Sequence, residues 1–119
     1  MKIEGLALRV SIYIGEADHW HGRPLYQAIV ELLRERGIAG ATVVRGIEGF
    51  GAKARLHSAR ILRLSEDLPI VIEVVDSEDR LRAVLPELDA MVVDGLSTLE
   101  PGAVIAYRAT SPDEHGREA

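Results

Sequence analysis

The chain has 119 residues, of which 47% are hydrophobic and 28% charged, and its net charge is −5. This length and composition predict a single globular domain and exclude a disordered or fibrous chain. The absence of cysteine excludes disulfides, thiol nucleophiles and cysteine metal sites. The acidic balance argues against nucleic acid as a partner. No apolar run approaches the roughly 20 residues of a membrane span, so we expect a cytoplasmic protein without membrane insertion.

The first predicted elements are a strand and a helix. Residues 6–14 alternate strictly, which predicts a strand with a mixed face and an apolar face that meets a helix layer; the apolar side chains are Leu6, Leu8, Val10, Ile12 and Ile14. A polar connection over residues 15–22 follows. Apolar residues at helical spacing then predict a helix over residues 23–36, with Pro24 in its first turn and Gly37 as its C′ residue.

The second half repeats this order. Residues 41–45 and 70–75 are predicted strands, and residues 58–64 alternate between them. Ser77 is a predicted N-cap, and Pro86 indicates that the following helix is kinked or ends near Leu85.

The end of the domain is predicted from shorter signals. Residues 91–93 should begin a fourth strand, Asp94 and Gly95 should form a turn or bulge, and residues 103–107 should form a further strand. The polar residues 109–119 are predicted to be a disordered tail.

This order of elements predicts an α+β fold of the ferredoxin-like βαββαβ plan. The sheet should be antiparallel and four-stranded, with the two helices on one face. Residues 1–108 would form this single domain.

The loop after residue 45 is the candidate site for an anion. Residues 45–63 contain five Lys or Arg and one acid, in an otherwise acidic chain. Glycines allow close backbone approach, and their N–H groups can bind an anion beside arginine and lysine side chains. The predicted ligand-binding residues are Arg45, Gly46, Gly49, Phe50, Gly51, Lys53, Arg55 and His57. A hinge or a solvated loop with incidental charge is the alternative.

Histidines and a carboxylate suggest a second function. Glu16, His19 and His21 precede the first helix, and with His57 they could hold a metal in a small metal-dependent enzyme. The same residues also suit a polar loop that starts the helix. Trp20 is suited to stack on a base or to fill a seam between subunits. We see no recognisable catalytic pattern around His57, so an enzyme is the less favoured interpretation.

Several segments together resemble the PII signal-transduction proteins. They are residues 37–43, Gly49-Phe50-Gly51 and residues 68–75. A closer resemblance, to the PII-like bacterial family catalogued as domain of unknown function 190, lies in Glu16 with Pro24-Leu25-Tyr26 and in residues 40–46 and 64–69. The resemblance covers roughly residues 5–108.

The resemblance implies a homotrimer whose mixed sheet faces line the centre. It also implies a cleft between subunits for an adenine nucleotide or another small anion, at the base of a loop over residues 47–64 that contacts a target protein. That target would be a membrane transporter or an enzyme. This sequence departs from PII in the turn over residues 94–100, which lacks lysine and includes acids, and in residues 50–69, which lack tyrosine. A purely structural trimer remains the third alternative.

Overall fold

The computed structural model describes residues 2–51, 57–58 and 67–110. Its described strands form one four-stranded sheet in the order β4-β7-β1-β8 and two two-stranded ribbons. All neighbours in the large sheet are antiparallel. The sheet strands are β1 (Lys2–Gly15), β4 (Ala41–Arg45), β7 (Pro69–Asp76) and β8 (Leu96–Arg108).

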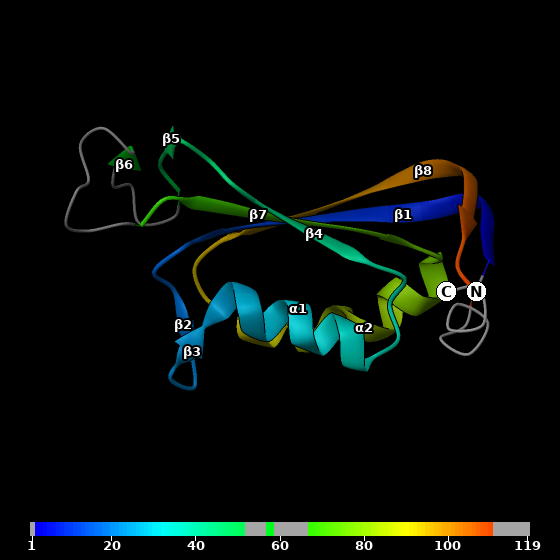
Figure 1. The fold of residues 1–119 in the computed structure, drawn as a ribbon. Coiled ribbons are helices and arrows are strands. Elements are labelled where there is room, and N and C mark those ends of the chain that lie inside the picture. Colours follow the sequence, from blue (N-terminus) through cyan, green and yellow to red (C-terminus); the bar gives the residue numbers. More distant parts are fainter. Residues whose placement is uncertain (1, 52–56, 59–66, 111–119) are drawn as a thin grey trace.

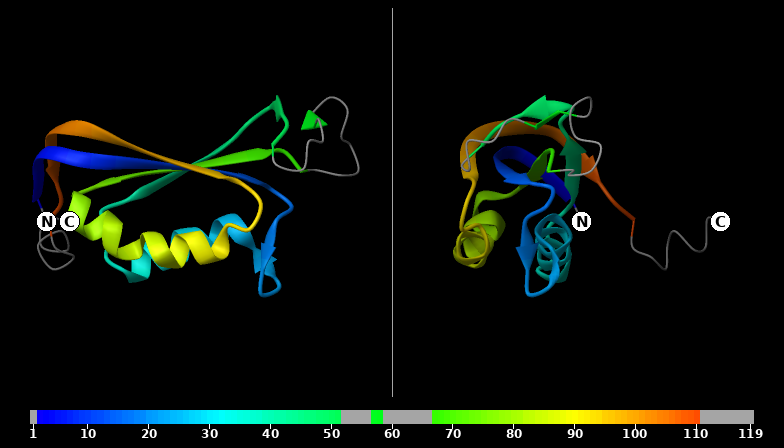
Figure 2. Two further views of the ribbon diagram at one scale, coloured as in Figure 1. Left: turned by 180° about the vertical axis from the view of Figure 1, so that it is seen from behind. Right: turned by 90° about the vertical axis from the view of Figure 1, so that its left-hand side faces the viewer.

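Two helices, α1 (Leu25–Glu35) and α2 (Glu78–Met91), lie side by side on one face of this sheet (Figures 1 and 2). Neither described helix covers the other face of the sheet, which we call the open face (Figure 2). This confirms the predicted α+β, ferredoxin-like plan.

The apolar core fills the space between the sheet and the helices. β1 supplies Val10 and Ile12, and the helices supply Ile29, Leu33 and Leu81, all almost completely buried. The predicted two faces of β1 are correct apart from Leu6, which is 85% exposed. Leu6 directly follows a register shift in the pairing of β1 with β8. A bulge of this kind turns the strand away from its original direction.

Helix α1 ends as the sequence predicts. Gly37 has a φ of 73°, a conformation that glycine adopts without steric cost. Its N–H donates to Arg34 O at 3.1 Å, and the Ile38 N–H donates to Leu33 O at 3.0 Å. These two bonds make a Schellman motif. Ile38 also packs against the core, so the helix end fixes the start of the connection to β4.

Helix α2 corrects one prediction. It runs through Pro86 to Met91 and does not end near Leu85. Pro86 is exposed and has no N–H to donate to the preceding turn of the helix. The later residues Leu88 and Met91 are buried against the core. Their burial holds the final turns in place. Tertiary packing therefore outweighs the cost of the proline.

The predicted strand over residues 91–93 is also wrong. Met91 is the last residue of α2, and residues 93–95 form bends. The predicted strand over residues 103–107 is the second half of β8, which continues through Pro101 and Gly102. β8 is an edge strand, where a proline can occur without removing a bond inside the sheet.

Two short ribbons were not predicted. β2 (His19–Trp20) pairs with β3 (Arg23–Pro24), and β5 (Glu48–Gly49) pairs with β6 (His57–Ser58). Pro24 is also the N-cap residue of α1. The alternating pattern over residues 59–64 and the tail from residue 111 lie outside the described residues.

Candidate functional site

The candidate site lies at one end of the sheet. β4 ends at Arg45, which pairs with Ile70, while Gly15 at the end of β1 pairs with Pro69. β8 begins next to them, where Leu96 pairs with Tyr13. The start of the glycine loop, the connection after β1 and the turn before β8 therefore all lie at this end, opposite the end of the sheet where Lys2 pairs with Arg108 (Figure 1).

Arg45 and Glu16 form an ion pair at this end. Arg45 Nη1 lies 3.0 Å from Glu16 Oε2, although the two residues are 29 positions apart. The side chain of Glu16 is only 22% exposed. Its other oxygen, Oε1, is buried and has no hydrogen-bond partner among the described residues. The pair thus offers one guanidinium to an anion and one carboxylate oxygen to a hydrogen-bond donor.

Two glycines at the base of the loop pack against Pro69. The Gly46 N–H donates to Pro69 O at 2.7 Å. A Cβ atom at Gly49 would lie 2.9 Å from Pro69 Cγ, which leaves no room for a side chain. These glycines let the loop approach the first residue of β7 closely. The Gly46 N–H is already bonded, so in this arrangement it cannot bind an anion.

The rest of the loop is only partly described. Phe50 is 71% exposed and Ile47 is 83% exposed, so two large apolar side chains face solvent. Gly51 is exposed as well. The backbone of His57 pairs with Gly49 across the β5–β6 ribbon. Lys53 and Arg55 lie outside the described residues, as does the side chain of His57.

The connection after β1 closes the other side of the site. The Glu16 N–H donates to Leu68 O at 2.8 Å, and the Ala17 N–H donates to Asp67 Oδ1 at 2.9 Å. These bonds join the segment before β7 to the end of β1. Both ends of the glycine loop are therefore fixed to the sheet, one through Gly46 and one through residues 67–68.

Three of the metal-binding candidates, Glu16, His19 and His21, do not converge on a common point. Glu16 pairs with Arg45, and the ring of His21 stacks on Trp20 with centroids 4.2 Å apart. His19 pairs with Pro24 in the β2–β3 ribbon and is exposed. Across residues 2–51, 57–58 and 67–110, no group of three or more His, Asp or Glu residues is arranged to hold a metal ion.

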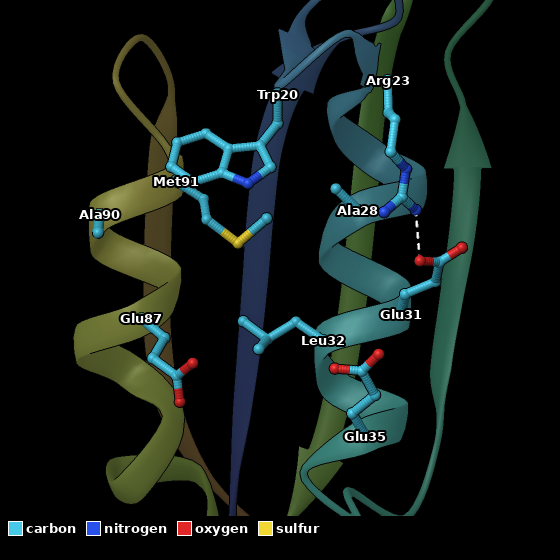
Figure 3. A pocket seen from close by; sticks show the side chains of 9 residues that line it. All are labelled: Trp20, Arg23, Ala28, Glu31, Leu32, Glu35, Glu87, Ala90 and Met91. Atoms are coloured by element: carbon cyan, nitrogen blue, oxygen red, sulfur yellow. Dashed lines mark ion pairs between the residues drawn. The ribbon is translucent and has the colours of Figure 1, made fainter.

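A groove between α1 and α2 was missed by the sequence interpretation. It encloses about 340 Å³. Trp20 from the β2–β3 ribbon reaches over it toward Met91 of α2, as Figure 3 shows. Carboxylates from both helices line it. The only available signal was the His21-Gly22 pair between Trp20 and Arg23, which suits a two-residue hairpin turn.

The fold is that of the PII-like proteins. A structure of CPII, a nitrogen regulatory PII-like protein from Thiomonas intermedia K12, bound to ADP, AMP and bicarbonate, superposes with a TM-score of 0.58 at 18% identity. The match covers 87% of this chain and 91% of CPII. A second structure of the same protein, bound to ADP and bicarbonate, gives a TM-score of 0.56.

Residues 7–104 match the DUF190 family, described as "Uncharacterized ACR", and the chain belongs to this family. A UPF0166 protein of Aquifex aeolicus is 35% identical over 94 residues, which are 79% of this chain and 89% of the relative. A UPF0166 protein of Methanocaldococcus jannaschii is 42% identical over 79 residues, which are 66% of this chain and 72% of the relative. Neither described helix is long and apolar enough to cross a membrane.

Proposed function

We propose that this protein is a PII-like regulatory protein and not an enzyme. It binds an adenine nucleotide or another small anion beside Arg45, in clefts between the subunits of a homotrimer. Residues 47–64 then carry the signal to a target protein in the cytoplasm, such as a membrane transporter or an enzyme.

The Arg45–Glu16 ion pair at the base of the loop carries this proposal. Arg45 is the last residue of β4, so its side chain is held on the sheet next to a loop that adds further cations. A guanidinium in such a position binds phosphate or carboxylate with two parallel hydrogen bonds. The bound molecules of the CPII structures, which are ADP, AMP, bicarbonate and acetate, are small molecules of this chemical kind.

The same contacts suggest how binding would reach the loop. An anion that draws Arg45 away from Glu16 would move the residue that directly precedes Gly46. The N–H of Gly46 is hydrogen-bonded to Pro69 O. That bond joins β4 to β7 where the loop begins. A ligand that binds one arrangement of the loop base more tightly shifts the population of loop conformations. The exposed Phe50 and Ile47 then supply apolar contacts for the target protein.

Acids near the site favour ligands with little negative charge. Asp94 is exposed in the turn before β8, and Glu16 already occupies the guanidinium of Arg45. Each added phosphate must overcome these negative charges. We therefore expect AMP, ADP, bicarbonate or acetate to bind more tightly than ATP when magnesium is absent.

Titration calorimetry with these five ligands tests the proposal. We expect at least one to bind, and Arg45→Ala to weaken its binding by about 10- to 100-fold, because a charge-assisted hydrogen bond contributes about 1.5–3 kcal/mol. Arg82→Ala is the matched control, since Arg82 is an exposed arginine on α2 that pairs with Glu78. Saturating concentrations of all five without heat or thermal stabilisation would overturn the ligand-binding role.

A further inference from the structure

The groove between α1 and α2 lies on the side of the molecule away from the open sheet face. None of the described residues of the glycine loop lines it, and neither does Arg45. Its apolar walls include Ala28 and Leu32 of α1 and Met91 of α2 (Figure 3). Its volume of about 340 Å³ is open to solvent on one side, so a small ligand would be only partly enclosed. This groove is therefore a second place where the chain could bind a ligand.

A tight hairpin positions Trp20 and Arg23 at this groove. His21 and Gly22 have φ values of 50° and 79°, as a two-residue turn with positive φ at both positions requires. Trp20 and Arg23 are paired across the ribbon, so both side chains lie on the same face, and both line the groove. The stacked ring of His21 supports the indole. Positive φ at a residue other than glycine costs energy, which the surrounding structure must offset.

The charges around the groove leave one exposed carboxylate, Glu35, without a close guanidinium partner. Arg23 pairs with Glu31 along α1, at the edge of the groove, where both side chains are exposed. Glu87 receives two hydrogen bonds from Arg36, at 2.9 and 2.6 Å. Glu35 is left with a contact of 3.8 Å to the same Arg36. One positive charge in the groove would therefore find a carboxylate that no guanidinium fully occupies.

The apolar and the charged parts of the groove are separated in space. In Figure 3, Trp20 and Met91 lie at one end, while Glu35 and Glu87 project from the facing helices toward the other end. Leu32 lies between them. An amphipathic molecule would place its apolar body under the indole and its charged group near Glu35.

We propose that this groove binds a small organic cation: a primary ammonium or guanidinium group on an apolar body. The carboxylate of Glu35 selects the positive charge, and the indole of Trp20 with Leu32 and Met91 covers the apolar body. This site is independent of the anion site at the base of the glycine loop. It would allow the protein to bind a cationic ligand as well as an anionic one.

Trp20 is the only tryptophan in the chain, so its fluorescence reports directly on the groove. The full chain is titrated with n-hexylammonium, n-hexanol and hexanoate at constant ionic strength. These probes share the apolar chain and differ in charge. We expect a saturable change with n-hexylammonium in the millimolar range, as for a ligand of few atoms. Its affinity should exceed that of n-hexanol about threefold, and hexanoate should not saturate the signal.

Glu35→Gln tests the role of the charge. We expect it to weaken n-hexylammonium binding about threefold and to leave n-hexanol unchanged, which is the size of an exposed ion-pair effect. Glu78→Gln is the control, because it also removes one negative charge but lies at the N-terminal end of α2 and does not line the groove. It should change neither affinity. Circular dichroism confirms that both variants fold.

Three results would overturn the proposal. One is the absence of saturation with n-hexylammonium, and another is equal binding of n-hexylammonium by the wild type and Glu35→Gln. The third is that a peptide with both termini blocked and a single central lysine binds more tightly than n-hexylammonium. That result would assign the groove to a protein partner and not to a free small molecule.

Discussion

Asp76 joins several segments of the scaffold. Its side chain is fully buried at the end of β7. Oδ2 accepts hydrogen bonds from the Ala39 N–H at 2.9 Å and from Arg80 Nε at 3.1 Å, and Oδ1 accepts one from the Ser77 N–H at 2.7 Å. Arg80 also donates to Gly37 O. One carboxylate thus links the end of α1, the approach to β4 and the start of α2.

We expect Asp76→Ala to lower the free energy of unfolding by about 2–4 kcal/mol. The change leaves two partly buried N–H groups without acceptors and removes the carboxylate partner of the Arg80 guanidinium. Urea denaturation followed by circular dichroism measures the effect. Asp79→Ala, an exposed acid in the first turn of α2, should cost less than about 1 kcal/mol. Equal effects of the two substitutions would contradict this role of Asp76.

Gly95 is required because the chain passes very close to β1. A Cβ atom there would lie 2.7 Å from Tyr13 O and 2.9 Å from a methyl carbon of Val92. We expect Gly95→Ala to destabilise the fold by about 1–3 kcal/mol through this overlap. At Gly40 a Cβ atom meets nothing within 4 Å, so Gly40→Ala should be close to neutral. Thermal unfolding of both variants checks the difference.

At the scale of elements, Arg36 and Glu87 join the C-terminal end of α1 to α2. The pKa of Glu87 is lowered, first because its carboxylate accepts hydrogen bonds from Arg36 and also because of the positive charge of that guanidinium. The pKa of Arg36 is raised by the same contact. Both groups are exposed, so salt and solvent weaken the contribution of the pair to stability.

This pair predicts a pH dependence. Glu87 is a carboxylate with a lowered folded pKa, so its stabilising contribution is complete above the ordinary pKa of about 4.3 and is lost as the pH falls through the folded pKa. We expect the melting temperature of the wild type to exceed that of Glu87→Gln at pH 7. The difference should shrink below about pH 4. A difference that stays constant down to pH 2 would contradict this explanation.

The elements themselves differ in how well the sequence predicts them. α1, β4 and β7 are confirmed nearly to the residue, because alternation, helical spacing and the glycine at the helix end act locally. The helix end predicted near Leu85 was wrong, since α2 continues through Pro86, and the strand predicted over residues 103–107 is part of the longer strand β8, which continues through Pro101. The burial of Leu88 and Met91 keeps α2 helical beyond Pro86. Because β8 is an edge strand, Pro101 can lie within it without removing a hydrogen bond inside the sheet.

For the whole molecule, the open sheet face carries exposed apolar side chains. Val44 is 50% exposed, Val75 and Tyr13 are each 43% exposed, and Leu96 is 58% exposed. Arg9 and Glu100 form an ion pair on the same face, and this contact raises the pKa of Arg9. An exposed apolar sheet face is a common site of association between chains. It supports the proposed trimer, in which these faces would line the centre.

We expect the wild type to be a trimer in solution and Val44→Glu to be mostly monomeric. The substitution would bury a charge in each subunit at the proposed interface, while Val44 is half exposed in the single chain, so the fold should tolerate it. Size-exclusion chromatography with light scattering measures the mass. Ala83→Glu, at an exposed position on α2, should stay trimeric. A monomeric wild type would contradict the proposed trimer and therefore also the proposed ligand clefts between subunits.

The sequence alone determined the class of fold, the faces of β1 and the position of Arg45 next to a glycine loop, since each depends on residues close together in the chain. It also singled out Glu16, His19, His21 and Trp20, but not their partners. Only the tertiary structure decided those. It set Glu16 against Arg45 and Trp20 over the groove between the helices. Contacts between residues so far apart in the chain depend on how the elements pack together. Local sequence patterns do not predict this packing.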